Sequence, residues 1–367
     1  MSQARWVLGL VLGVSGCSGS YVGGDAPPLP NTGGGRGVMA GAGGSVAEGV
    51  AASPGGGWGN TGGDGISGSG NSGAVGNSGG AIDAGRCDSP IDAWLAFDSD
   101  AADFNRDLYL IRPDGTQLTR LTDHDAIDKE PYISPDGRRL SFTSDRDGSL
   151  QIYVMKLSDR SIEQVTHRPE GASQSAFSAD GELIAFNSGA SVYTVKPDGS
   201  DETLIASGLD SFNAYFSPRF LGEDELVFDR RNEIKAVKLD GSAQRYIVDN
   251  WTTSIESPSV SPSGNEIAYA THCGVGTEVQ GFSIWTTPAT TNTPPCGGRR
   301  LTPVGDRLDS NRPAWGPSNT IAYQRINSAN VSGIALIGRA AGSVPCMLTS
   351  PDDDSRNPSW SSVGLEL

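Results

Sequence analysis

The stretch PYISPDG, residues 131–137, is the clearest copy of a pattern that the chain repeats six times. After this Ser-Pro-Asp-Gly turn come an apolar strand (residues 140–142), a second strand around Ile-Tyr-Val (152–154) and a Val-Thr pair (165–166). Asp-Gly supplies the positive-φ positions that tight turns between antiparallel strands require. A repeat of about 40–45 residues that holds four short strands predicts one blade of a β-propeller.

The turn serine aligns the six copies, and a large apolar residue precedes it in each. The positions aligned with the turn serine are Ser134, Ser178, Ser217, Ser261, Gly316 and Ser361, preceded by Ile133, Phe177, Phe216, Val260, Trp315 and Trp360. The chain enters the pattern at residues 94–97 with a second-strand sequence, and it leaves at 357–361 with a first-strand sequence. The two termini together therefore complete one blade, which removes exposed sheet edges. We expect an all-β, six-bladed propeller that is closed by its N- and C-terminal strands.

The repeat resembles the TolB-type propeller family. The resemblance covers residues 94–361 and rests on the Ser-Pro-Asp-Gly turn, SDRDG (144–148), IYVM (152–155) and the closing pairs at 121–122, 165–166, 301–302 and 348–349. It implies the fold and leaves the function open, because similar repeats occur in Tol-system periplasmic proteins, peptidase propeller domains and some polysaccharide lyases. In TolB a separate N-terminal α/β domain precedes the propeller, and here a Gly-rich stretch takes its place, so a role in the Tol system does not carry over.

The N-terminal residues have the pattern of a bacterial lipoprotein. Residues 1–16 hold Arg5 and a short apolar run (6–14) typical of a signal peptide. The run ends in Val-Ser-Gly-Cys17, which looks like a lipobox with Cys17 as the acylated residue; the alternative is a plain signal peptide with an incidental cysteine. Residues 17–86 are rich in Gly and Ser, and we expect a disordered linker. Residues 87–367 form the propeller. Ser18 rather than Asp after the cysteine favours the outer membrane, on the periplasmic or the surface-facing side.

The net charge of the chain limits the classes of partner that it is expected to bind. The chain has a formal net charge of −16, of which residues 1–86 contribute −1 and the propeller therefore −15. This acidity argues against nucleic acid or anionic lipid as partners. It is compatible with a cationic ligand, a basic protein face, Ca²⁺ or a merely solvated surface. We expect a monomer that meets an envelope protein or peptide and touches the membrane only through its lipid anchor.

Four further cysteines allow two disulfides in an exported chain. Three pairings are possible, and we favour Cys273–Cys296, within the long fifth copy, and Cys87–Cys346, near the point of ring closure. We do not expect a zinc site, because no two cysteines have the close spacing of a zinc knuckle.

No catalytic constellation stands out, and we predict a protein that is not an enzyme. No Gly-x-Ser-x-Gly elbow leads into a helix, and a serine repeated in several blades is architectural. Alternating carboxylates could ligate Ca²⁺ at Asp98, Asp100 and Asp103, and no other cofactor is indicated. The rim of a ligand site is expected in the loops that lead from one blade to the next, at His124, Asp125, Asp128, His167, Arg168, Glu170, Asp210 and Asp353.

Two functions follow from these observations. The first is a lipid-anchored module of the cell envelope that binds or scaffolds a protein or ligand. The alternative is a propeller-type lyase or hydrolase that acts on an envelope or extracellular glycan. It would require clustered histidines at the funnel, and the chain has three histidines in all.

Overall fold

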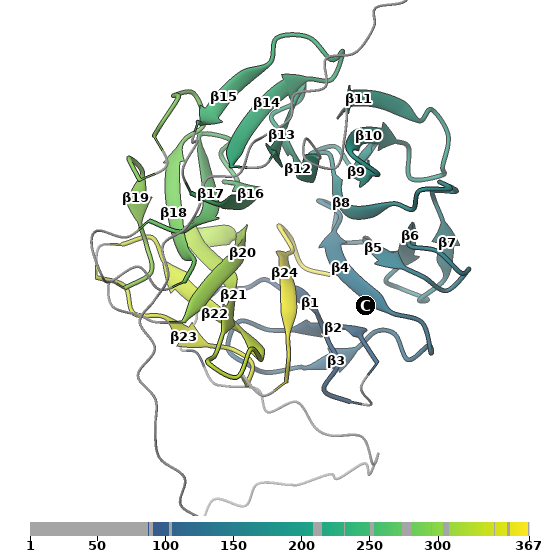
Figure 1. Ribbon diagram of the computed structural model, residues 1–367. Helices are drawn as coiled ribbons and strands as arrows, with labels where there is room; N and C mark the ends of the chain where they lie inside the picture. The colour runs from purple at the N-terminus through teal and green to yellow at the C-terminus, as the bar shows by residue number, and fades with distance from the viewer. Residues whose placement is uncertain are drawn as a thin grey trace, which may run out of the picture. The chain divides into compact units, whose positions relative to one another are not determined.

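The computed structural model describes residues 87, 91–102, 105–207, 215–230, 232–249, 253–273, 281–294, 296–303, 308–340, 342–350, 353–365 and 367. They form six four-stranded antiparallel sheets around a common centre, which confirms the predicted six-bladed propeller (Figure 1). The predicted signal peptide, Cys17 and the predicted linker lie outside the described residues. Among the described residues, no helix is long and apolar enough to cross a membrane.

Each blade runs outward from an innermost strand. Blades 1 to 3 comprise β24 (Arg356–Trp360), β1 (Leu95–Ser99), β2 (Asp107–Ile111), β3 (Thr119–Arg120); β4 (Asp128–Ile133), β5 (Arg139–Ser144), β6 (Gln151–Lys156), β7 (Ile162–Gln164); and β8 (Ser173–Phe177), β9 (Ile184–Ser188), β10 (Ser191–Val195), β11 (Thr203–Ser207).

Blades 4 to 6 follow in chain order. They comprise β12 (Tyr215–Leu221), β13 (Glu225–Arg230), β14 (Glu233–Lys238), β15 (Arg245–Val248); β16 (Ile255–Val260), β17 (Glu266–Thr271), β18 (Ser283–Pro288), β19 (Arg299–Arg300); and β20 (Asp309–Trp315), β21 (Thr320–Ile326), β22 (Ser332–Gly338), β23 (Cys346–Met347), with a 3₁₀ turn, η3 (Pro317–Asn319), between β20 and β21.

Strands from opposite ends of the propeller sequence close the ring. β24 pairs antiparallel with β1, so that Trp360 lies opposite Leu95 and Ser359 opposite Ala96. The backbone N–H of Ser361 donates to the Trp94 carbonyl at 2.9 Å, and the Ser361 hydroxyl accepts from the Trp94 N–H at 2.8 Å. Figure 1 shows the yellow β24 beside β1. The predicted shared blade is therefore confirmed.

Two disulfides join the cysteines in the pairing that the sequence favours. Cys87, ahead of β1, is bonded to Cys346 in β23, with their Cα atoms 5.9 Å apart. Cys273 and Cys296 are bonded within blade 5, with a Cα separation of 5.7 Å. The first bond links the start of blade 1 to blade 6, so it spans the same junction that β24 closes.

The cores lie between blades. Each second strand places an aromatic ring, fully buried, against a neighbouring blade: Phe97, Phe142, Phe186, Phe228, Tyr269 and Tyr323. Phe97 of blade 1, for example, belongs to one cluster with Ala322 and Ile334 of blade 6. Successive residues of a strand point to opposite faces of the sheet. Apolar residues of one second strand can therefore pack against both neighbouring blades. The alternating second-strand pattern in the sequence has this origin.

The structure corrects the alignment of the fourth copy. Ser217, which the sequence places at the turn between the first two strands, lies inside β12, and Leu221 occupies the position equivalent to Ser134. The residue before the turn is accordingly Phe220, and Phe216 is 40% exposed. The error arose because a second Ser-Pro pair in this copy belongs to a bulge within the strand. Gly316 takes the serine position in blade 6 because a Cβ there would lie 2.4 Å from the Trp360 ring.

Candidate functional site

A bulge interrupts every innermost strand at the same level of the channel. The register of each of these strands against its neighbour shifts by the insertion of one residue. One residue at each bulge has a φ between 49° and 58°, in the left-handed region. These six residues, called the belt below, are Glu130, Gln174, Ser217, Ser257, Arg312 and Asn357. A bulge re-aims side chains and is common beside functional sites, and non-glycine residues in this region cost about 1–3 kcal/mol each.

The belt surrounds a small cavity on the axis of the propeller. All six belt residues line a space of about 100 Å³, together with the residues that follow them on the same strands. The innermost strands are sheet edges that face this channel. Proline follows the belt residue in five blades, with Ser175 as the exception. Since proline has no N–H, it blunts an edge that would otherwise offer unpaired donors.

Hydrogen bonds join three pairs of neighbouring belt residues. The Gln174 N–H donates to the Glu130 carboxylate at 3.1 Å, and the Ser217 N–H donates to the Gln174 side-chain oxygen at 3.0 Å. On the other side of the ring, the Arg312 guanidinium donates to the Asn357 side-chain oxygen. These bonds cross blade boundaries, so the belt holds adjacent blades together at the channel.

A second row of side chains supports the belt from β1, β5, β9, β13, β17 and β21. It consists of the residue after each buried aromatic: Asp98, Thr143, Asn187, Asp229, Ala270 and Gln324. Asp98 accepts from the Glu130 N–H at 2.9 Å and from the Asn357 amide at 2.6 Å. Thr143 donates to the Glu130 carboxylate at 2.9 Å. The left-handed backbone of the belt is thus stabilised by polar side chains on the adjacent strands.

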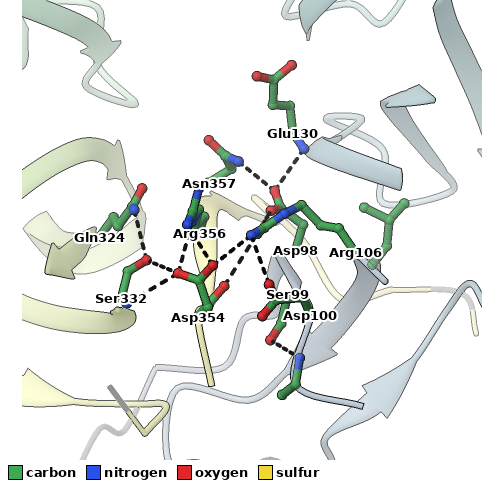
Figure 2. A network of polar contacts seen from close by, with 12 residues as sticks. Asp98, Ser99, Asp100, Arg106, Glu130, Gln324, Ser332, Asp354, Arg356 and Asn357 are labelled. Carbon is green, nitrogen blue, oxygen red and sulfur yellow. Dashed lines mark hydrogen bonds and ion pairs between the residues drawn. The ribbon is translucent and has the colours of Figure 1, made fainter. Parts of the chain in front are cut away.

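Arg106 connects this row to the loop ahead of β24 (Figure 2). Its guanidinium binds the Asp98 carboxylate at 2.7 Å and the Asp354 carboxylate at 2.8 Å. Asp354 also receives Arg356 at 2.6 Å and the Ser332 hydroxyl at 2.6 Å. Burial raises the pKa of Asp98, and the Arg106 charge opposes that rise. The network joins blades 1 and 6 beside the belt, at the place where the ring closes.

Unlike Asp98, Asp229 forms no ion pair with an arginine among the described residues. Burial, reinforced by the nearby Glu256 carboxylate, raises the pKa of Asp229 to about 7, and hydrogen bonds from Ser257 and Ser217 oppose that rise. The folded state therefore binds this proton more tightly than the unfolded state does. The contribution of Asp229 to stability is complete at low pH and declines as the pH rises from about 4 to about 7.

The variant Asp229→Asn is expected to abolish this decline. Asparagine keeps an acceptor for the Ser257 N–H and does not ionise, so the variant should be more stable than the wild type at pH 8, by about 2–4 kcal/mol. The difference in unfolding free energy between the variant and the wild type should be smaller at pH 5. Urea unfolding at the two pH values measures it. Asp180→Asn is the control, because the Ser178 hydroxyl lowers the pKa of this exposed turn residue and it does not titrate between pH 5 and 8. An equal gap at both pH values would contradict the assignment.

The predicted rim residues do not form one cluster. His124, Asp125 and His167 are exposed, and within the described residues no hydrogen bond or ion pair joins the two histidines. Asp128 is buried and binds both its carboxylate oxygens to Arg146 at 2.9 Å. Arg168 binds Glu202 at 2.8 Å, with the exposed Glu170 at 3.6 Å. Asp353 is buried, and Asp210 lies outside the described residues. Asp128 and Arg168 therefore serve ion pairs within the fold.

Two of the three predicted calcium ligands, Asp98 and Asp100, form ion pairs with Arg106. Asp98 binds it directly, and Asp100 lies 3.6 Å from it. Asp103 is not among the described residues. Within the part of the chain that the structure describes, no group of three or more His, Cys, Asp or Glu side chains is arranged to hold a metal ion. The calcium site stays a prediction.

The belt is the feature that the sequence analysis missed. A signal for it exists, because in five copies a proline follows the belt residue, three positions before the position aligned with Ser134. The belt residues themselves are of five different types, so no residue conservation between copies marks them.

Comparisons with known proteins agree with this architecture. A family model described as the TolB beta propeller domain matches residues 68–221. A TolB homolog of Chlorobium luteolum is 38% identical over 81 residues, which are 22% of this chain and 17% of that protein. The Tol-Pal system protein TolB of Helicobacter hepaticus is 28% identical over 144 residues, 38% of this chain and 31% of that protein. The chain thus matches less than a third of the length of either relative.

Solved structures extend the similarity over the whole propeller. The crystal structure of TolB from Acinetobacter baumannii has a TM-score of 0.60 at 15% identity, covering 75% of this chain and 68% of that one. A chain of a nidogen–laminin complex has a TM-score of 0.58 at 10% identity, covering 74% and 99%. At such identities the likeness shows the fold alone. The repeats, the blade order and the family model that matches residues 68–221 together show a β-propeller with TolB-like repeats.

Proposed function

We propose that this protein is a lipid-anchored binding module of the cell envelope, in which the propeller presents a channel and two loop-bearing faces to an envelope protein or peptide. The observation that carries the proposal is the closed ring with an axial cavity lined by six inward-facing belt residues. Ligand sites commonly lie in such concave, largely preformed places. The matches to Tol-Pal system proteins support an envelope setting.

The glycan lyase or hydrolase alternative receives no support from the site. It requires neighbouring histidines with a carboxylate, and His124 and His167 are exposed loop residues that no hydrogen bond joins within the described part of the chain. The polar groups of the belt form hydrogen bonds that hold neighbouring blades together.

The anchor is tested by Cys17→Ser. A diacylated cysteine holds a protein on a bilayer because each buried CH₂ contributes about 0.8 kcal/mol, and two chains suffice for stable attachment. We expect the wild type to fractionate with membranes and the variant to move almost completely to the soluble fraction. Ser18→Ala is the matched control, since it alters the adjacent residue and leaves the thiol. Equal membrane association of wild type and Cys17→Ser would remove the lipid anchor from the proposal.

The binding role is tested by chemical cross-linking in intact cells, followed by capture from detergent-solubilised membranes. A propeller of unrelated surface on the same N-terminal segment is the control. Enrichment of one envelope protein over this control supports a binding module. Turnover of a glycan library by the purified protein would instead establish the enzymatic alternative.

A further inference from the structure

Arg219 is a channel cation with no ion-pair partner among the described residues. It lies on β12, two residues after belt residue Ser217, and its half-buried side chain lines the axial cavity. One guanidinium nitrogen donates to the Pro218 carbonyl at 2.8 Å, and the guanidinium carbon lies 5.3 Å from the centre of the Tyr132 ring. Desolvation lowers the pKa of Arg219, and the nearby Tyr132, Asp229 and Glu130 oppose that shift.

The two carboxylates whose charges act on Arg219, those of Glu130 and Asp229, also accept hydrogen bonds from other groups. Glu130 accepts hydrogen bonds from Thr143 and Gln174. Asp229 accepts from Ser217 and Ser257, and its raised pKa makes it a weak anion at neutral pH. A guanidinium has five N–H donors in a planar fork, of which Arg219 uses one within the described structure. A planar fork of N–H donors matches the two oxygens of a carboxylate.

An apolar collar lies directly beside this guanidinium. The large residue at the end of each innermost strand contributes to it: Ile133, Phe177, Phe220, Val260, Trp315 and Trp360. The collar lines a depression of about 520 Å³ that opens among the turns at the ends of these strands. Tyr132, Phe220 and Trp315 line both this depression and the axial cavity, so the two spaces adjoin. A ligand that enters from the turn face meets apolar walls first and the Arg219 charge behind them.

We propose that the channel binds a carboxylate carried on an apolar body. The carboxylate pairs with Arg219, and the body packs against Phe220 and the two collar tryptophans. The acidic propeller, with a net charge of −15, repels small anions at long range. Contact with the collar offsets this repulsion, so hydrophilic anions should bind poorly. The proposal deepens the binding role proposed above, since it names the ligand chemistry of one face. The same group is offered by a free apolar acid and by a peptide that ends in an apolar residue.

Calorimetric titration tests the site. The 367-residue chain carrying Cys17→Ser is titrated with 3-phenylpropionate and with 3-phenylpropionamide, so that no acyl chain or detergent competes for the probe. We expect the acid to bind about 10- to 100-fold more tightly than the amide, as for a charged hydrogen-bonded pair. The same ratio is expected between acetyl-Ala-Ala-Phe with a free carboxylate and its amide if the natural source is a peptide terminus. A ratio present only for the small acid points to a free metabolite.

Arg219→Gln should remove the preference for the acid. Arg160→Gln is the matched control: it removes the same charge from an exposed residue beyond β6 and should keep the preference. Arg219→Lys keeps the charge without the fork and should recover only part of the affinity. Thermal unfolding confirms that each variant is folded. Equal affinity for acid and amide, no binding of the acid, or an unchanged preference in Arg219→Gln would each overturn the site. Acid binding without capture of an envelope partner would retain the site and reject the protein-binding role.

Discussion

Trp360→Ala is expected to lower the free energy of unfolding by about 3–5 kcal/mol, the usual cost of truncating a buried tryptophan. Trp360 is 9% exposed and packs with Leu95 and Phe97 in the core between blades 1 and 6. Its indole N–H also donates to the Ala314 carbonyl at 3.1 Å. The variant therefore leaves a cavity and an unpaired carbonyl at the junction that closes the ring.

Urea unfolding followed by circular dichroism measures this cost. Val363→Ala is the matched control, because Val363 lies three residues further along the same segment and is 43% exposed. It should change stability by less than about 1 kcal/mol, as exposed substitutions usually do. Similar midpoints for the two variants would show that β24 contributes little to closure.

Loss of the Cys87–Cys346 bond is expected to cost more than loss of the Cys273–Cys296 bond. The first closes a loop with a sequence separation of 259 and the second one of 23. Chain-entropy arguments predict about 5–6 kcal/mol for the long loop and about 3 for the short one, as upper limits. The Cys87–Cys346 bond should therefore lower the conformational entropy of the unfolded chain more than the Cys273–Cys296 bond does.

The pair of double variants provides its own control. Cys87→Ser with Cys346→Ser, and Cys273→Ser with Cys296→Ser, each replace two sulfurs by two hydroxyls. Urea unfolding of oxidised protein should show the first to be less stable than the second by about 2 kcal/mol. Equal stabilities, or the reverse order, would contradict a closing role for Cys87–Cys346.

The repeat predicted the fold because a blade is a local unit. The turn, the alternating second strand and the aromatic of each copy lie within about 40 residues, and the incomplete copies at both ends indicated a shared blade. The alignment failed only in blade 4, where two signals of the same composition compete. Ser217-Pro218 at the bulge resembles the turn motif, whereas the true turn begins at Leu221.

The sequence predicted less of the candidate site than of the fold. The belt residues have positive φ without being glycine, because polar side chains of the neighbouring blade hold them there. Such contacts join residues 30 to 45 positions apart or more, and no local pattern reports them. For the same reason the sequence does not reveal the ion pairs of Asp128 and Arg168, whose partners Arg146 and Glu202 lie across turns and strands.

The junction of β24 with β1 also has a consequence for biosynthesis. A chain delivered from its N-terminus exposes the inner edge of β1 while blades 2 to 6 are still being made, because its partner strand comes some 260 residues later. Unpaired strand edges can pair with other chains and lead to aggregation. The inner edge of β1 therefore stays unpaired until β24, the last strand, has emerged. During that time a holdase chaperone could bind and shield this edge.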